Sequence, residues 1–227
     1  MMDPAIQTYA SRDGLAEAVA ALLAERLRAL IAGAGRARVA VPGGTTPGPM
    51  LTILGQADLD WGRVAVTLTD ERLVPAESAR SNQRLLGETL FKGRAAAATF
   101  VPLLAAAADR AGTLDGVCEG LRRVALPLDI AVLGMGADMH TASLFPGADG
   151  LAEALAPDAP PAVAIAAPGA DEPRVTLSAP ALAAAERHIL IVGAGKRAAL
   201  ERARAIADPR RAPVCAVLAG ATVHYAD

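Results

Sequence analysis

Aromatic residues are scarce in this sequence, and cysteine, lysine and clustered positive charge are scarce too. Only 3% of the 227 residues are aromatic, whereas 53% are apolar. The core must therefore be built from Ala, Val, Leu and Ile, which favours helices packed on a β-branched sheet over an aromatic-rich binding module. The net charge is −2 and no basic block is present. Nucleic-acid binding is therefore not expected, because it usually needs a clustered cationic face.

Signals for export, membrane insertion and metal binding are lacking as well. The N-terminus has no basic start followed by an apolar run. The alanine-rich stretch 94–110 is too short and too weakly apolar to span a bilayer. Cys118 and Cys215 lie far apart and outside any CxxC or His-rich pattern, so neither a disulfide nor a zinc site is indicated. We expect a cytoplasmic protein with no membrane partner, and the sequence leaves open whether it is a monomer or a homodimer.

Apolar strand-like runs alternate with helical stretches over most of the chain. Such an alternation, with strands that are apolar throughout, predicts an α/β fold with a mostly parallel, Rossmann-like sheet and helices on both faces. The Pro/Ala-rich segment 156–170 is interpreted as a surface connection, so we expect one domain over residues 1–227. The predicted strands are 37–44, 64–71, 99–103, 129–136, 174–177 and 187–196, and the predicted helices are 14–32, 47–54, 82–90, 109–124, 181–186 and 197–207.

Four predicted strands end in unusual residues, and ligands of open parallel sheets bind beyond the carboxyl ends of the strands. The first of these ends is PGGTTP, in which Gly43 and Gly44 let backbone N–H groups approach a ligand. Thr45 and Thr46 add two hydroxyls, and Thr46 is predicted as the N-cap of the next helix. Glycines, hydroxyls and a helix N-terminus together are typical of an anion site. An ordinary strand–helix turn is the alternative.

The second strand end carries TDER at 69–72, with Ser81 and Asn82 shortly after it. Arg72 can pair with a phosphate or stabilise developing negative charge, and Asp70 can hold hydroxyls or orient a base. Ser81 and Asn82 are candidates for binding the same ligand. A solvated cluster of salt bridges is the alternative for these charges.

The third strand end, GMGADMHTASLFPG, contains the best candidate for acid–base chemistry. His140 can take and return a proton near neutral pH, and Asp138 precedes it by two residues. Gly134 and Gly136 make this a loop on which side chains can converge on a ligand. A histidine satisfied by the backbone is the alternative. No second His or Cys lies nearby at ligand spacing, so we expect no metal.

The fourth strand end is GAGK, which places Lys196 near the start of the next helix. Of the 22 basic residues only Lys92 and Lys196 are lysines. Lysine in an arginine-rich chain suggests a need for a compact ammonium, as in phosphate binding, and chance is the alternative. His188, at a strand start, and His224, near the C-terminus, are predicted to be structural or surface residues.

Taken in this order, the segments resemble the glucosamine-6-phosphate isomerase/6-phosphogluconolactonase family, and within it the 6-phosphogluconolactonases. The resemblance implies hydrolysis of 6-phosphogluconolactone to 6-phosphogluconate in the oxidative pentose phosphate pathway, without a cofactor. It also implies the fold of glucosamine-6-phosphate deaminase, which is similar to that of ribose-5-phosphate isomerase. The matching stretches extend over roughly residues 39–200 and are VPGGTTPGPML, TLTDERLVPAESARSNQRLL, DIAVLGMGADMHTASLFPG and RVTLSAPALAAAERHILIVGAGKRAAL.

The resemblance also implies roles for individual residues. His140 would be the general base and later the acid, and Asp138 and Asp70 would line the site. Met139 departs from the pattern, since the family usually has Gly directly before the histidine. Glycine there permits φ > 0 or close approach of a ligand, so we expect methionine to cost something in either case. Thr45 replaces the usual Ser and keeps the hydroxyl. The implied anion-binding groups are Arg72, Lys196, Arg174 and Gly43–Thr46.

Two other functions are weighed against the lactonase. An amino-sugar phosphate isomerase or deaminase follows its loop histidine with a pattern like HIxFNEP, which places a catalytic Glu five residues after the His. Phe145 occupies that position here, which disfavours this activity. A non-catalytic sugar-phosphate sensor often loses the acid–base pair and needs a DNA-binding segment. This chain keeps Asp138 and His140, and we expect no helix-turn-helix.

Overall fold

The structure of the chain is a computed structural model that describes residues 3–104, 113–169 and 171–227. Within these ranges the central sheet has seven strands in the order β1-β10-β9-β6-β2-β3-β5, and every neighbouring pair is parallel. The predicted parallel sheet is therefore confirmed. Its strands are β1 (Ala5–Thr8), β2 (Ala37–Val41), β3 (Val64–Leu68), β5 (Thr99–Val101), β6 (Ile130–Gly134), β9 (Glu186–Val192) and β10 (Thr222–Ala226).

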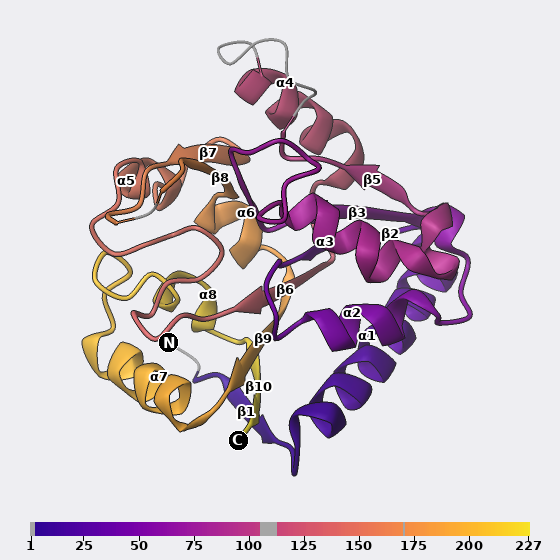
Figure 1. Cartoon of the computed structure of the whole chain (residues 1–227), viewed down its shortest axis with the longest axis horizontal. Coiled ribbons are helices and arrows are strands. Elements are labelled where there is room, and N and C mark those ends of the chain that lie inside the picture. The colour runs from indigo at the N-terminus through magenta and orange to yellow at the C-terminus, as the bar shows by residue number, and fades with distance from the viewer. Residues whose placement is uncertain (1–2, 105–112, 170) are drawn as a thin grey trace.

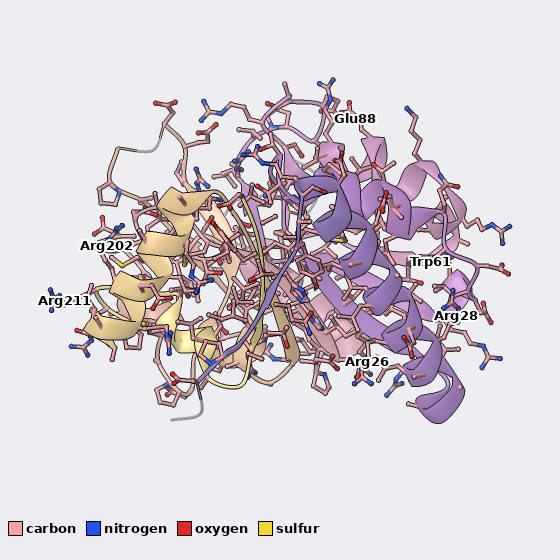
Figure 2. The ribbon with its side chains drawn as sticks, turned by 90° about the horizontal axis from the view of Figure 1, so that it is seen from below. Arg26, Arg28, Trp61, Glu88, Arg202 and Arg211 are labelled. Carbon is pink, nitrogen blue, oxygen red and sulfur yellow. The ribbon has the colours of Figure 1, made fainter. Side chains whose placement is uncertain are left out.

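Helices cover both faces of this sheet (Figure 1). Arg26 of α1 lies on one side of the molecule and Arg202 of α7 on the other (Figure 2). Strands β2, β3 and β6 are almost entirely buried because both of their faces are covered. None of the described helices combines the length and the apolar character that crossing a membrane requires. The α-helices are α1 (Arg12–Ala34), α2 (Gly48–Gly55), α3 (Asn82–Glu88), α4 (Thr113–Gly120), α5 (Leu151–Ala154), α6 (Ala179–Ala183), α7 (Ala194–Ile206) and α8 (Cys215–Leu218).

Several helices and strands begin or end at other residues than the sequence predicted. The helix predicted at 14–32 is extended in α1 because Ser11 caps its start, accepting a hydrogen bond from the Gly14 N–H at 3.0 Å, and Gly35 ends it with a φ of 75°. The strand predicted at 187–196 ends at Val192, so α7 already begins at Ala194. The first residues of the helix predicted at 109–124 lie outside the described ranges; its described part is α4 followed by a π-helical turn, Leu121–Ala125.

A small antiparallel sheet, which the sequence did not predict, joins the edge of the cavity described below. It consists of β4 (Asp70–Arg72), β8 (Arg174–Leu177) and β7 (Ala162–Ile165) in the order β4-β8-β7. The single strand predicted at 64–71 was therefore wrong beyond Leu68. The chain changes sheet at Thr69, whose N–H donates to the Val41 carbonyl at 3.0 Å and whose carbonyl accepts from the Leu177 N–H at 2.9 Å.

The interpretation of 156–170 as a surface connection was also wrong at residues 162–165. This segment contains β7, and Ala162, Val163 and Ile165 of that strand are buried. The strand pairs with β8 and packs against α4 and α5, so these three apolar side chains belong to the core. The strand was missed because its apolar run is only four residues long and lies in a sequence rich in alanine and proline.

His188 of β9 and His224 of β10 lie side by side on neighbouring strands and are buried, with exposed fractions of 3% and 0%. His188 Nδ1 lies 3.1 Å from His224 Nε2. The hydroxyl of Tyr9 lies 2.8 Å from His224 Nδ1, and His188 Nε2 lies 3.2 Å from Glu186 Oε1. Glu186 in turn forms an ion pair of 2.5 Å with Arg26 of α1. Both histidines are structural and lie outside the cavity.

This buried pair predicts that stability falls as the pH falls below about 6.5. Burial lowers the pKa of both imidazoles, and burial together with the nearby His188 lowers that of His224 from 6.5 to about 4. Below pH 6.5 the unfolded chain binds protons that the folded chain does not bind. For His224 alone, about 2 kcal/mol of unfolding free energy is lost between pH 7 and pH 5. Urea unfolding at pH 7 and pH 5 measures the loss, which should be smaller in His224→Gln than in the wild type. An equal loss in the two proteins would contradict a lowered pKa of His224.

Candidate active site

A cavity of about 250 Å³ opens at the carboxyl ends of the neighbouring strands β9, β6 and β2. All four strand ends singled out in the sequence contribute to its wall. Apolar residues, including Leu133, Met135 and Leu190, line its base. Two predicted site residues, Ser81 and Asp138, are not part of the wall. The predicted residues that line the cavity are Gly43, Gly44, Thr45, Thr46, Asp70, Arg72, Asn82, Gly134, Gly136, His140, Arg174 and Lys196.

His140 is paired with Asp138, although only His140 faces the cavity. Its Nδ1 lies 2.6 Å from Asp138 Oδ1, and its side chain is 30% exposed. The hydrogen bond with His140 lowers the pKa of Asp138, which favours the charged carboxylate. A carboxylate at Nδ1 keeps a proton on that nitrogen and leaves Nε2 to accept one. The pair therefore has the arrangement of a general base held by an acidic partner.

The loop that carries this pair is fixed on both sides. Gly136 is required at its start, because a Cβ there would lie 2.2 Å from His140 Nδ1 and 2.3 Å from Asp138 Oδ1. The Val214 N–H donates to the Met139 carbonyl at 3.1 Å, and Arg202 Nη2 of α7 donates to the Ala137 carbonyl at 3.0 Å. These two hydrogen bonds connect the loop to α7 and to the residue that precedes α8.

Asp70 faces the cavity with both carboxylate oxygens already engaged. Ser143 Oγ donates to its Oδ2 at 2.6 Å, and Thr69 Oγ1 donates to its Oδ1 at 3.2 Å. Ser143 and Thr69 are fully buried. These donors fix the orientation of a carboxylate that can accept further hydrogen bonds from substrate hydroxyls. Neither donor was singled out in the sequence.

Glu71 points away from the cavity because side chains alternate along β4. It is 2% exposed and accepts four hydrogen bonds: Oε1 from the N–H groups of Arg72 and Asn82, and Oε2 from Ser81 Oγ and the Gln83 N–H. Ser81 also caps α3, so its role in the structure is to hold the start of that helix. Glu71 and Ser81 thereby place Asn82, which lines the cavity.

Arg72 and Arg174 stand directly opposite each other on strands β4 and β8. Like charges at such positions repel each other. The pKa of Arg174 is lowered, mainly because the side chain is buried and also because the positive charge of Arg72 lies nearby. Among the described residues the Nε atoms of both side chains have no hydrogen-bond partner, although both are buried. Arg72 Nη1 donates to the Arg80 carbonyl at 2.5 Å, which anchors one of the two. Two such cations beside a cavity are suited to an anion.

Lys196 and the loop Gly43–Thr46 supply the remaining polar wall. Lys196 lies in the first turn of α7, and burial lowers its pKa. Thr46 was wrongly predicted as a helix cap: Pro47 occupies the cap of α2, and its side chain has no group that could form a hydrogen bond. Glycine is required at position 43 because the side chain of Asn82 packs closely against the backbone there. A Cβ at this position would lie 1.9 Å from Asn82 Oδ1.

The described residues contain no group of three or more His, Cys, Asp or Glu side chains that could hold a metal ion. The cysteines do not add one, since Cys118 is buried and Cys215 partly buried, and both are free thiols. The chemical groups at the cavity are therefore an imidazole–carboxylate pair, a fixed carboxylate, two guanidiniums and an ammonium.

A known protein family matches almost the whole chain. A model of the family described as glucosamine-6-phosphate isomerases/6-phosphogluconolactonase matches residues 10–225. The chain belongs to this family. It is 43% identical to the 6-phosphogluconolactonase of Rhizobium meliloti (strain 1021), over 96% of this chain and 94% of that protein. It is 40% identical to that of Pseudomonas aeruginosa, over 97% and 94%.

Solved structures of 6-phosphogluconolactonases share the fold. The crystal structure of the Shewanella baltica OS155 protein superposes with a TM-score of 0.94 at 31% identity, covering 99% of this chain and 98% of that one. The structure of the Neisseria gonorrhoeae protein, described as a putative 6-phosphogluconolactonase, gives a TM-score of 0.90 at 32% identity, covering 99% and 100%. The fold that the sequence predicted by resemblance is confirmed.

Met139, where the resemblance predicts Gly, adopts a φ of 70°. This is the left-handed region, which costs residues with a Cβ about 1–2 kcal/mol. Its side chain is partly buried against the core, which offsets part of that cost. Methionine is thus accommodated in the backbone conformation that glycine would adopt without strain.

We expect Met139→Gly to be more stable than Met139→Ala by about 1 kcal/mol, the reverse of the usual order of these residues. Both variants lose the same packing, so the difference reports the backbone alone. Urea unfolding at neutral pH measures it. If the alanine variant is as stable as the glycine variant, the positive φ is not maintained in solution.

Proposed function

We propose that the chain hydrolyses 6-phospho-D-glucono-1,5-lactone to 6-phospho-D-gluconate, and that a single domain carries the whole reaction. One observation supports this most strongly: His140, held by Asp138 behind it, lines the same cavity as three cations, Arg72, Arg174 and Lys196. The pair can move a proton, and the cations suit a substrate that carries a phosphate and develops negative charge.

His140 is the proposed general base. Nε2 removes a proton from water as the oxygen attacks the lactone carbonyl carbon, and Asp138 stabilises the imidazolium that forms. Arg72 stabilises the oxyanion of the tetrahedral intermediate. When the bond from the carbonyl carbon to the ring oxygen breaks, Nε2 returns its proton to that oxygen. The acid product then ionises, so one proton is released to solvent. A lactone carbonyl is already reactive, and the proposal requires neither metal nor cofactor.

The phosphate is proposed to bind Lys196 and the loop Gly43–Thr46, which lies next to the N-terminus of α2. Arg174 is a further phosphate-binding candidate. A dianion near the Arg72–Arg174 pair relieves the repulsion between these neighbouring charges, which favours phosphorylated over neutral lactones. Asp70, held by Ser143 and Thr69, is left to accept hydrogen bonds from sugar hydroxyls.

The two rival functions gain no support from the site. Asp70 is the only carboxylate among the described residues that line the cavity, and Ser143 and Thr69 already engage both of its oxygens. A deaminase would need a further carboxylate near His140, where Phe145 lies instead. A sensor would not need the His140–Asp138 pair, which is intact. We also propose that the protein acts in the cytoplasm, as a monomer or homodimer, without a nucleic-acid or membrane partner.

Hydrolysis of freshly generated 6-phosphogluconolactone, followed in a pH-stat, tests the proposal. The substrate also hydrolyses spontaneously, so the rate without protein is subtracted at every concentration. Proton release that is accelerated in proportion to protein, and that saturates with substrate, is the expected result. A rate equal to the spontaneous one overturns the proposed function.

A further inference from the structure

The aromatic ring of Phe145 contacts two of the proposed site residues at once. Its centroid lies 4.2 Å from that of the His140 imidazole, with 33° between the two planes. The guanidinium carbon of Arg174 lies 5.0 Å from the same centroid. His140 belongs to the loop after β6 and Arg174 to β8 of the small sheet, so Phe145 connects groups from two separate sheets.

The contact with Phe145 restricts the orientation of the His140 ring, which the hydrogen bonds of His140 do not fix by themselves. Asp138 fixes one atom of the imidazole, Nδ1, but a single contact does not fix the plane of a ring that is 30% exposed. A second ring packed against the imidazole, here at a tilt of 33°, restricts that plane. The negative face of an aromatic ring also attracts a guanidinium within about 6 Å, and it attracts an imidazolium in the same way. Arg174 needs such a partner because its Nε has none among the described residues.

We propose that Phe145 is a positioning residue, which orients the imidazole of His140 and holds the guanidinium of Arg174 beside it. The inference rests on the proposed role of His140 as general base. In the reaction the ring faces an imidazole that gains a positive charge, so it favours the protonated intermediate as well as the orientation of Nε2. The position that disfavours deaminase chemistry in the sequence thus has its own function in a lactonase.

Phe145→Leu and Phe145→Tyr test the proposal. Leucine keeps an apolar side chain but loses the ring, whereas tyrosine keeps the ring. We expect kcat of Phe145→Leu to fall about tenfold on both phosphorylated and unphosphorylated gluconolactone, because misplacing a catalytic group by even 1 Å can cost up to 10²-fold. KM should rise about threefold on the phosphorylated lactone only, through Arg174. Phe145→Tyr should retain most of the activity.

An NMR measurement detects the contact between the rings of Phe145 and His140 independently of enzyme activity. The chain has three histidines, and two of them are the buried pair His188 and His224. Ring protons of His140 should be shifted upfield in NMR spectra by the Phe145 ring current, and they should move downfield in Phe145→Leu. Phe91→Leu is the matched control, since Phe91 pairs with Phe100 at 5.5 Å and does not line the cavity.

The outcomes are distinct. Folded Phe145→Leu with wild-type kcat, or with an unchanged His140 signal, overturns the positioning role. Equal losses in the leucine and tyrosine variants overturn it too, because packing rather than the aromatic face is then responsible. Failure of the proposed function shows earlier and separately, as wild-type protein that does not accelerate lactone hydrolysis although its His140 signal carries the ring-current shift.

Discussion

Replacing His140 with alanine is expected to lower kcat on 6-phosphogluconolactone by about 10²- to 10⁴-fold, the range for loss of a general base. The imidazole lies in the cavity wall with Nδ1 held 2.6 Å from Asp138 Oδ1, so Nε2 is the atom that can accept the proton of the attacking water. Alanine leaves the carboxylate and the cations in place. Substrate binding should therefore change little, and the loss should fall on kcat.

His224→Gln is the matched control for this experiment, because His224 is buried outside the cavity. It should lower stability but leave kcat close to that of the wild type. Circular dichroism and thermal unfolding of both variants establish that they are folded. Near wild-type turnover in folded His140→Ala would remove His140 from the mechanism.

Replacing Lys196 with alanine should raise KM for the phosphorylated lactone by roughly 5- to 150-fold, which corresponds to about 1–3 kcal/mol of lost charged hydrogen bonding. Lys196 lies in the first turn of α7 and lines the same cavity as the loop Gly43–Thr46. Its binding energy orients the substrate, so kcat should change much less than KM. Inhibition by inorganic phosphate and by 6-phosphogluconate should weaken in parallel.

Unphosphorylated gluconolactone separates binding from catalysis, because it has no group to place at Lys196. Lys196→Ala should leave kcat/KM for this substrate nearly unchanged. Lys92→Ala, which removes the other lysine at an exposed position, should affect neither substrate. Equal losses on both lactones in Lys196→Ala would show that the lysine acts at the reacting end of the substrate instead.

The pH dependence of this binding has a defined direction. Burial lowers the pKa of Lys196 from its ordinary value of 10.5. The ammonium is present below its pKa and lost above it, so KM for the phosphorylated lactone should begin to rise at a lower alkaline pH than an exposed lysine would give. That rise should be absent from the profile of the Lys196→Ala variant.

Much of this architecture follows from local patterns in the chain. Strands such as β2, β3 and β6 are apolar on both faces, and only a parallel sheet covered on both sides buries such strands. The polar strand ends then meet because carboxyl ends of parallel strands lie at one edge. Asp138 and His140 are two residues apart, so their pairing is also local. The sequence likewise identified Met139 as the position where glycine was expected.

Other features depend on residues that are distant in the chain. Ser143 fixes Asp70 across 73 residues of sequence, and no local pattern connects the two. The sequence predicted the strand that is β8, but β4, of three residues, is too short to show a period of its own, and no local pattern pairs the two strands. Their pairing nevertheless places Arg174 opposite Arg72.

The sequence by itself therefore determined the parallel core, the edge at which the cavity lies and the pairing of His140 with Asp138, because each follows from a periodicity or a short spacing. Only the tertiary structure decided which side chains complete the site. The change of sheet at Thr69, the buried strand β7 and the contact of Phe145 with both His140 and Arg174 each need a partner from another part of the chain. Such partners are selected by packing of the whole fold, in which the gain from burial and pairing outweighs weak local preference.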